Sequence, residues 1–547
     1  MNRQGRILIV DDEEQWRKEL VETLKRSGFH VDAVSRAREA LELASESFYH
    51  VLVLDIRLVH TDRSNVEGID LLEELFERGL CEATKVIMLS AFGTKEHMRT
   101  SFRKYKVVDF LSKEDFDNQL FLETVRQVFS EKVDVNLSLD ILWQEVSGPE
   151  QVLANFEMGR VSDDRDAAFQ SLLAVELEDL LCRLFHRAES VMVQPMAPGH
   201  SGTGVLRVQP FYSTGGGRTV VVKFGNIQQI DEEYSNYKQY IQPFIGGGRN
   251  TTILDVRRTS HLGGIIYSFI GAANDNLEDF GSFYRHATVP QIEIALERLF
   301  GDTCGSWYAS PGRLRPHKLT EDYQQLLNVT PEKLARGLSD LAESVHGKEK
   351  LYFKSLRGKR AFTNPLLATE DRSFARPTYI CTTHGDFNER NLLVDNTGNI
   401  WLIDFLRTGR GHILRDVSDL DSVVRFQLLA AEEATLEERL KMEKVLCSIE
   451  HFSQLEQLAD NFPTVNSALA KTYAIVIYLR KLARKLVNQN PSDGIDEYYI
   501  ALLYHAMNTF RFRDLPVRQR EHALLCASLL TDRLGLKNKN ILQTTPR

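Results

Sequence analysis

The stretch His384-Gly385-Asp386-Phe387-Asn388-Glu389-Arg390-Asn391, followed by Ile403-Asp404-Phe405, carries three groups that phosphoryl transfer from a nucleotide requires. The carboxylate of Asp386 can orient or deprotonate an acceptor hydroxyl. The amide of Asn391 and the carboxylate of Asp404 are ligands of the kind that hold Mg²⁺ against nucleotide phosphates. These residue types in this order point to phosphotransfer chemistry.

The sequence around these residues predicts a β-hairpin. The short apolar runs Leu392-Leu393-Val394 and Trp401-Leu402-Ile403 are separated by the turn-forming sequence Asp395-Asn396-Thr397-Gly398-Asn399. Two β-prone runs joined by such a turn are typical of an antiparallel pair. The ends of this hairpin would present Asn391 and Asp404 side by side.

The string HGDxxxxN with a following IDF resembles the catalytic core of aminoglycoside phosphotransferase-like kinases, small-molecule relatives of the protein kinases. The resemblance implies an α+β, two-lobed protein-kinase-like fold. It also implies ATP and Mg²⁺ as cofactors and a small-molecule hydroxyl as the acceptor, whose identity the sequence does not give. An upstream glycine-rich loop and a strand lysine are further expectations.

The upstream sequence contains both features. The stretch Gly199-His200-Ser201-Gly202-Thr203-Gly204 precedes a strand-like run and would let backbone N–H groups approach phosphates. Lys223 closes the β-branched run 219–222, where the family's phosphate-contacting lysine lies. The alternative for the glycine-rich stretch is a simple hairpin turn. The alternative for Lys223 is a solvated charge at the end of a strand. The candidate nucleotide-binding residues are Gly199, Ser201, Gly202, Gly204 and Lys223.

A lysine in this role needs a glutamate from the next helix. Four apolar residues at helical spacing predict that helix: Ile230, Tyr234, Tyr237 and Ile241. Glu233 is the preferred partner of Lys223, with Glu232 as the alternative. The alternative to both is that Glu232 and Glu233 only form an exposed acidic first turn of the helix.

Two positions after the catalytic motif are also informative. Asp416, in the string Arg415-Asp416-Val417-Ser418-Asp419-Leu420, is expected to brace the catalytic loop. Arg407 stands where the acceptor should approach and departs from the family pattern. It would bind a phosphate or an acidic substrate, or pair with a surface carboxylate.

Residues 6–131 contain four buried-strand patterns, and each ends in polar residues. These are Asp11 and Asp12 after 6–10, Asp55 after 51–54, Ser90 after 86–89, and Lys113 after 107–111. Such strands predict a parallel α/β sheet with a site along its carboxyl edge. The segment 15–27 has the apolar spacing of a helix between the first two strands.

This segment resembles the receiver domain of bacterial response regulators, a doubly wound flavodoxin-like α/β fold. The resemblance implies that Asp55 is the phosphoacceptor and that Asp11 and Asp12 help to bind Mg²⁺ with it. Three crowded carboxylates repel one another, so a divalent cation is needed before an anionic phosphoryl donor can approach.

The resemblance also assigns the residues that respond to phosphorylation. Ser90 and Lys113 would contact the incoming phosphoryl group, and Phe110 would be the switch aromatic. The sequence departs from the family at the long polar loop 57–68 and at Glu114, which stands where a proline is usual. Neither departure removes a required group.

Composition bounds the class of protein. The chain has 547 residues, enough for three or four domains, and a net charge of −9 without long blocks of one sign. Six scattered cysteines are typical of reduced thiols. No apolar run approaches the roughly 20 residues of a membrane span, and the first strand begins too early for a signal peptide. We therefore expect a cytoplasmic protein.

The patterns predict four segments: a receiver domain at 1–131, a helical connector at 132–188, a kinase-like N-lobe at 189–271, and a kinase-like C-lobe with a helical extension at 272–547. The connector would relay the receiver's state or form a homodimer contact. In the extension, helices are clearest at 436–449, 467–488 and 497–512.

The second of these helices has a basic side. We interpret it as a solvated face, with an anionic substrate or nucleic acid as the alternative occupant. Its residues are Lys471, Arg480, Lys481, Arg484 and Lys485. No DNA-binding module is evident.

The sequence thus predicts a two-component signalling protein. A sensor histidine kinase or a phosphotransfer protein would phosphorylate Asp55, and the receiver would regulate an ATP- and Mg²⁺-dependent phosphotransferase. The alternative is a nucleotide-binding pseudokinase scaffold under receiver control, which assembles partners in a bacterial signalling or defence system.

Overall fold

The computed structural model describes residues 3–59, 62, 65–80, 83–91, 101–144, 148–154, 164–196, 203–244, 250–270, 277–309, 311–345, 349–356, 358, 360–366, 376–458 and 462–535. The chain forms two compact units. The first comprises Met1–Tyr234 and Thr252–Ser268, and the second comprises Ser235–Thr251 and Phe269–Arg547.

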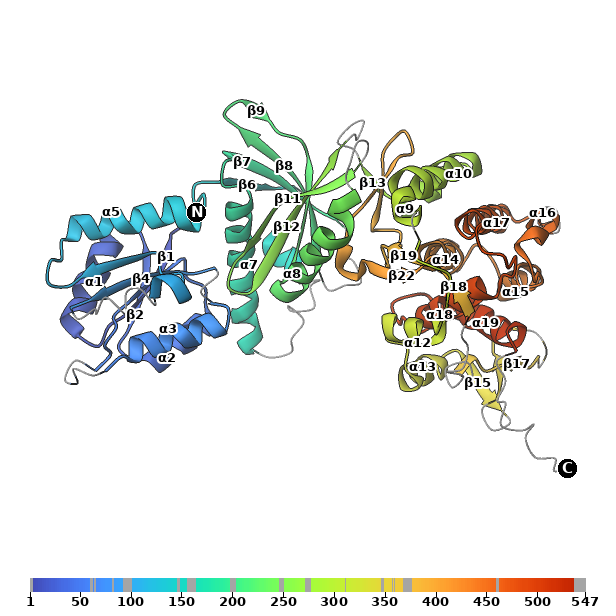
Figure 1. Cartoon of the computed structure of the whole chain (residues 1–547), viewed down its shortest axis with the longest axis horizontal. Helices are drawn as coiled ribbons and strands as arrows, with labels where there is room; N and C mark the ends of the chain where they lie inside the picture. Colours follow the sequence, from blue (N-terminus) through green and yellow to red (C-terminus); the bar gives the residue numbers. More distant parts are fainter. Residues whose placement is uncertain are drawn as a thin grey trace. The chain divides into compact units, whose positions relative to one another are not determined.

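The first unit begins with a five-stranded parallel sheet in the order β2-β1-β3-β4-β5. Its strands are β1 (Arg6–Val10), β2 (His30–Val34), β3 (Val51–Leu54), β4 (Lys85–Ser90) and β5 (Asp109–Ser112). Helices α1 (Glu14–Arg26) and α5 (Asn118–Val128) cover one face, and α2 (Ala37–Glu46) and α3 (Glu67–Glu77) cover the other (Figure 1). This confirms the predicted flavodoxin-like fold of the receiver.

The central strand β3 explains why the polar residues gather at one edge. All four of its residues are buried, because both faces of a parallel sheet are covered by helices. Gly68 lies so close to the end of this strand that an added Cβ would stand 1.9 Å from the carbonyl oxygen of Asp55. Only glycine fits there, and it lets the chain return past Asp55 into α3.

A second, seven-stranded sheet follows in the order β11-β12-β10-β8-β7-β6, with β9 paired to β8. It comprises β6 (Asp140–Trp143), β7 (Ser190–Pro195), β8 (Gly204–Tyr212), β9 (Gly215–Gly216), β10 (Val220–Asn226), β11 (Asn250–Arg258) and β12 (Leu262–Ile270). Only β6 and β7 pair in parallel among the described pairings of this sheet. Helix α8 (Ile227–Asn236) follows β10 directly.

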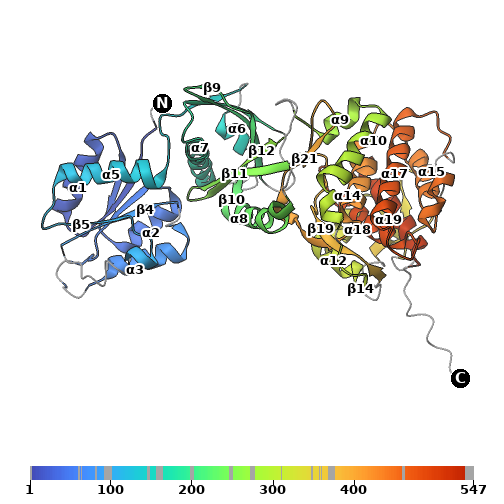
Figure 2. The same cartoon turned by 45° about the horizontal axis from the view of Figure 1, so that its top comes forward.

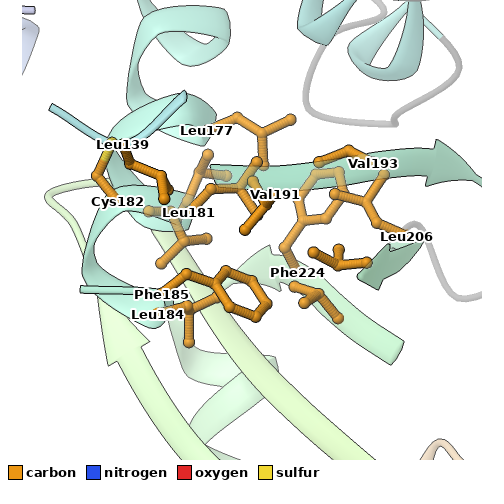
Figure 3. Packing of buried hydrophobic residues seen from close by; sticks show 14 of the residues in the cluster. Leu139, Leu177, Leu181, Cys182, Leu184, Phe185, Val191, Val193, Leu206 and Phe224 are labelled. Atoms are coloured by element: carbon orange, nitrogen blue, oxygen red, sulfur yellow. The ribbon is translucent and has the colours of Figure 1, made fainter. Parts of the chain in front are cut away.

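The long helix α7 (Asp164–Leu184) packs against this sheet through a continuous apolar cluster. Figure 3 shows Leu177 and Leu181 of α7 facing Val191, Val193 and Leu206 of the sheet. An added Cβ on Gly264 in β12 would meet Leu180 of α7 at 3.0 Å, so helix and strand are in close contact.

The segment 132–188, expected to be a helical connector, contains α6 (Pro149–Leu153) and α7, and it also contains β6. Ile141 and Trp143 pack against the same apolar cluster as α7. Their alternation along the strand places both on the inner face. The segment is therefore part of the sheet's own structure.

The second unit contains small antiparallel sheets and many helices. The strands are β13 (Glu278–Asp279), β14 (Arg315–His317), β15 (Ala342–Val345), β16 (Lys350–Phe353), β17 (Phe362–Thr363), β18 (Arg376–Thr378), β19 (Ile380–Thr383), β20 (Leu392–Val394), β21 (Ile400–Leu402) and β22 (Gly409–His412). The predicted hairpin is confirmed, since β20 and β21 pair antiparallel with Leu392 opposite Leu402.

The helices of this unit are α9 (Phe280–His286), α10 (Val289–Arg298), α11 (Gly305–Tyr308), α12 (Leu319–Leu326), α13 (Pro331–Leu338), α14 (Arg415–Val423), α15 (Leu436–Leu446), α16 (Leu455–Leu458), α17 (Ser467–Leu486), α18 (Asp496–Phe510) and α19 (Val517–Arg533). Figure 2 shows α14, α17, α18 and α19 forming its helical core. The three helices predicted in the extension correspond to α15, α17 and α18.

The interpretation of the basic side of α17 is wrong for Arg480, which is fully buried. Its guanidinium Nε lies 3.6 Å from Asp421 Oδ2 of α14. A buried carboxylate on a neighbouring helix therefore takes this arginine out of solvent.

Among the described residues, no helix combines the length and hydropathy that a membrane crossing requires.

Leu181→Ala is expected to lower the free energy of local unfolding of α7 by about 2–5 kcal/mol, because it opens a cavity in a fully buried cluster. Amide hydrogen exchange of α7 in the full chain measures this quantity. Val175→Ala on the same helix is the matched control, because Val175 is 54% exposed. Equal losses in the two variants would contradict the packing described for α7.

Candidate functional site

The polar residues predicted at the carboxyl edge of the receiver sheet lie together. Asp11 and Asp12 follow β1, and Asp55 follows β3. Carboxylate oxygens of these residues and of Glu13 all lie within 4.8 Å of one another. Glu13 was not predicted, although its place directly after the acidic pair was a usable signal. The four carboxylates form the acidic cluster of the receiver.

Lys113 lies within this acidic cluster. Its Nζ is 2.7 Å from Asp11 Oδ2, 2.6 Å from Asp55 Oδ2 and 3.3 Å from Glu13 Oε1. Burial lowers the pKa of Lys113, but the neighbouring carboxylates of Asp11 and Asp55 outweigh burial and raise it. The ammonium therefore stays charged and compensates part of the acidic cluster.

Burial raises the pKa of Asp11 to about 6. The charge of Lys113 opposes this shift, while the carboxylate of Asp55 adds to it. Asp11 therefore takes up a proton at a higher pH than an ordinary aspartate does.

Ser90 and Phe110 lie on the strands predicted for them. Ser90 ends β4 and is buried, and its carbonyl oxygen accepts the backbone N–H of Lys113 at 3.1 Å. Phe110 lies on β5 opposite Met88 and is half-buried. The N–H of Glu114 donates to Ser112 Oγ at 3.2 Å, which orders the turn after Lys113 without a proline.

Lys223 and Glu233 form a buried ion pair. Lys223 Nζ lies 2.7 Å from Glu233 Oε2, and each side chain is 1% exposed. The hydroxyl of Tyr267 on β12 also hydrogen-bonds to Glu233. Glu232 is exposed, so of the two candidates it is Glu233 that meets the lysine.

Only one of the predicted loop glycines lies within the described residues. Gly204 begins β8 opposite Phe224, and an added Cβ would stand 2.2 Å from the ring of Phe224. Glycine is therefore required beside the strand that carries Lys223. Gly199, Ser201 and Gly202 lie outside the described residues.

The predicted catalytic loop, residues 384–391 and here called the catalytic-loop segment, is held by Asp416, as predicted. Asp416 Oδ2 accepts the N–H of His384 at 2.9 Å and the hydroxyl of Tyr308 at 2.8 Å. Its Oδ1 accepts the N–H of Gly385 at 2.8 Å. Three donors to one buried carboxylate fix the start of the loop.

Asn391 and Asp404 stand at the ends of the hairpin. Asn391 Nδ2 donates to the carbonyl oxygen of Asp386 at 3.0 Å, and the N–H of Ile403 donates to the carbonyl oxygen of Asn391 at 3.1 Å. Asp404 is buried and has a φ of 68°, a left-handed conformation that costs energy in a residue other than glycine. Such strain is often found at functional positions.

Asp386 is half-buried, and burial raises its pKa. Arg407 opposes that rise, whereas the nearby carboxylates of Asp404 and Asp419 add to it. Arg407 Nη1 lies 4.0 Å from Asp386 Oδ1, and the side chain of Arg407 is 45% exposed. The predicted base therefore has one solvent-accessible cation beside it.

Asp419 has a structural role that was not predicted from the sequence. Its Oδ2 accepts the N–H of Phe387 at 2.8 Å, and its Oδ1 lies 3.0 Å from His505 Nδ1. Burial alone would raise the pKa of Asp419, but His505 and this hydrogen bond lower it. The three-residue spacing from Asp416 on α14 was the available signal, because residues i and i+3 share a helix face.

Comparisons with known proteins match two parts of the chain to protein families. The model of the response regulator receiver domain matches residues 7–126. The transcriptional regulatory protein SrrA of Staphylococcus aureus is 36% identical over 96 residues, which is 18% of this chain and 36% of the regulator. The chain thus spans about a third of the length of this curated relative.

Solved structures of receiver domains are also similar to this chain, over about a quarter of its length. One is a CheY-like receiver domain protein from Methanospirillum hungatei JF-1, at 25% identity, with 24% of this chain and 96% of that chain covered and a TM-score of 0.21. Another is the receiver domain of a Francisella response regulator, at 23% identity, with 23% and 98% covered and a TM-score of 0.21.

A second family model matches a larger part of the chain. The model described as ternary complex associated domain 9 matches residues 188–354 and 352–511. These residues include Lys223, Glu233, the catalytic-loop segment and the hairpin, and together they exceed half of the chain. The chain therefore belongs to the ternary complex associated domain 9 family and carries a response regulator receiver domain at its N-terminal side.

Proposed function

We propose that this protein is a phosphotransferase whose activity is controlled by its receiver domain. The receiver indicates two-component signalling, in which a phosphodonor such as a sensor histidine kinase phosphorylates the receiver. We further propose that Asp55 accepts that phosphoryl group, and that the ternary complex associated domain 9 transfers a phosphoryl group from ATP to a small-molecule hydroxyl.

The buried Lys223–Glu233 pair is the observation that carries this proposal. A strand lysine held by a helix glutamate is the arrangement with which protein kinases contact nucleotide phosphates. Full burial of such a pair gives little stability for its cost, because desolvation offsets most of the attraction. A functional reason for keeping it is therefore favoured.

The catalytic-loop segment supplies the remaining roles. In the proposed reaction the acceptor oxygen attacks the terminal phosphorus of ATP, its proton passes to a carboxylate oxygen of Asp386, and ADP leaves. A raised pKa makes Asp386 a better proton acceptor than an ordinary aspartate. Asp416 and Asp419 would act as positioning residues, since they hold the backbone on either side of Asp386.

The donor sets of both sites fit Mg²⁺, because carboxylate and amide oxygens are the ligands that this ion prefers. Asp11, Asp12 and Asp55 would hold it in the receiver, and Asn391 and Asp404 would hold it at the ends of the β20–β21 hairpin. When bound, the ion neutralises negative charge on the phosphoryl groups. Lys113 would then contact the phosphoryl group on Asp55.

A second candidate function is a nucleotide-binding scaffold that transfers nothing. Arg407 favours it, because a guanidinium 4.0 Å from Asp386 stands where an acceptor hydroxyl would approach. Under the main proposal the same arginine binds an anionic group of the acceptor. Turnover with any acceptor separates the two functions.

Asp386→Asn is expected to lower the rate of phosphoryl transfer by about 10²–10⁴-fold while nucleotide binding is retained, because the amide cannot accept the acceptor's proton. Radiolabelled ATP and a titration of nucleotide affinity give the two readouts. Glu297→Gln, a carboxylate in a surface pair with Lys485, is the control and should leave both unchanged. Unchanged turnover in Asp386→Asn would refute the role of this residue.

The affinity of the acidic cluster for Mg²⁺ is expected to fall as the pH drops below about 6. The pKa of Asp11 is raised in the folded chain, so Asp11 binds a proton there as the pH falls through about 6 and then competes with the cation. The loss should approach about tenfold per pH unit for one competing proton.

Intrinsic fluorescence can report this titration, because the Trp16 ring lies 5.3 Å from Lys113 Nζ. Trp16→Phe identifies the signal, and Asp11→Asn should weaken Mg²⁺ binding and remove this pH dependence. A Mg²⁺ affinity that stays constant in the wild type from about pH 7 to about pH 5 would contradict the assignment.

A further inference from the structure

Helix α7 makes a buried polar contact with the receiver domain. Asp179 of α7 accepts a hydrogen bond from His50 Nε2 at 2.7 Å and from Arg183 Nε at 2.8 Å. His50 Nδ1 accepts the backbone N–H of Arg6 at 2.9 Å, so Nε2 carries the ring proton. Arg183 Nη1 also donates to the carbonyl oxygen of Ala83 in the receiver at 3.2 Å.

Both side chains of the His50–Asp179 contact are buried, so breaking this contact costs free energy. The side chain of His50 is 1% exposed and that of Asp179 is 5% exposed. Burial alone would raise the pKa of Asp179, but Arg183 and His50 together lower it. Asp179 is thus an ionised group whose partners cannot be replaced by water, and removing one partner is costly.

A second contact lies one helical turn away. Glu176 of α7 is fully buried and accepts the backbone N–H of His261 at 2.6 Å and its Nδ1 at 2.8 Å. His261 Nε2 lies 3.1 Å from the carbonyl oxygen of Ser45, in the receiver. Both ring nitrogens therefore face acceptors, and His261 links α7 to the receiver at a second point.

His261 immediately precedes β12, which leads to the Lys223–Glu233 pair. Ile265 of β12 is opposite Lys223 of β10, and the hydroxyl of Tyr267 hydrogen-bonds to Glu233. Tyr267 is fully buried. A displacement of β12 along its length would therefore move the group that holds the partner of Lys223.

On the receiver side, strand β3 connects His50 to Asp55. His50 immediately precedes β3, and Asp55 immediately follows it. Every residue of β3 is buried, so the strand is held on both faces. Adding a phosphoryl group to Asp55 changes the charge at one end of β3, and His50 stands at the other end.

We propose that α7 and β12 form a coupling element that links the phosphorylation state of Asp55 to the Lys223–Glu233 pair, with Tyr267 as the positioning residue. The His50–Asp179 and Glu176–His261 contacts are its two attachments to the receiver. The coupling concerns the regulation of the proposed phosphotransferase and in that respect rests on the proposed function. Such coupling requires that the element has two arrangements and that both sites shift the balance between them.

Hydrogen exchange of the full chain tests the coupling without any need for turnover. Beryllium fluoride with Mg²⁺ serves as the phosphoryl mimic on Asp55. In the wild type, exchange of the amides of β12 and α8 is expected to change by at least about fivefold, the lower range of allosteric couplings. In Asp179→Asn and in His261→Gln, the change should be confined to the receiver.

The matched control is Glu42→Gln, which removes an exposed ion pair with Arg38 on receiver helix α2. It should respond as the wild type does. An unchanged exchange of β12 in the wild type would overturn the proposal, and so would equal responses in the wild type, Asp179→Asn and His261→Gln.

Tyr267→Phe keeps the ring and removes only the hydroxyl, so it tests the last step even if the Asp179 variant folds poorly. The response of β12 to beryllium fluoride should persist, while the accompanying change in the affinity for a fluorescent ATP analogue should be lost. A retained change in affinity would overturn the role of Tyr267.

The two proposals fail in different ways. A wild-type chain in which β12 responds but no nucleotide binds would refute the proposed function and leave the coupling standing. A chain that binds nucleotide while β12 and the nucleotide affinity ignore beryllium fluoride would refute the coupling alone. Reciprocity adds a further check, because nucleotide must then change the affinity of the receiver for beryllium fluoride.

Discussion

A carboxylate removed from water needs donors or a cation, and Asp179 meets this need with His50 of the receiver and Arg183 of its own helix. That requirement ties the receiver to α7, and the opposite side of α7 packs in the apolar core of the seven-stranded sheet. A helix that packs tightly on one side and pairs a buried charge on the other cannot shift without cost to both. The receiver and the sheet that carries Lys223 are therefore joined through α7 by a buried polar contact and an apolar core.

The same electrostatic requirement organises the other sites. Lys113 neutralises part of a cluster of four carboxylates at the receiver edge. Lys223 forms an ion pair with the buried Glu233, and the side chain of Asp416 accepts hydrogen bonds from the backbone of the catalytic-loop segment. In each case a charged group is buried at an energetic cost and is paired by a residue of another element. The sites that the proposed function uses are thus built into the core.

The sequence predicts most of the receiver, because polar residues that follow buried parallel strands must meet at one edge of the sheet. It also predicts the hairpin of Asn391 and Asp404, since that depends on local turn chemistry. Edge strand β2 was missed because His30 and Asp32 interrupt its apolar pattern. The contacts of Arg480, Asp179 and Asp419 were out of reach for another reason: each of these charges is paired by a residue more than fifty positions away, which no local pattern records.

The most direct test of the central claim is ATP consumption by the purified chain with Mg²⁺, compared between the wild type and Asp404→Ala. Each is assayed with and without acetyl phosphate, in the presence of a pooled metabolite extract that supplies acceptors. The proposed function predicts consumption that depends on Asp404, and fractionation of the extract would then identify the acceptor. No consumption by either protein, together with measurable nucleotide binding, would contradict it and favour the scaffold.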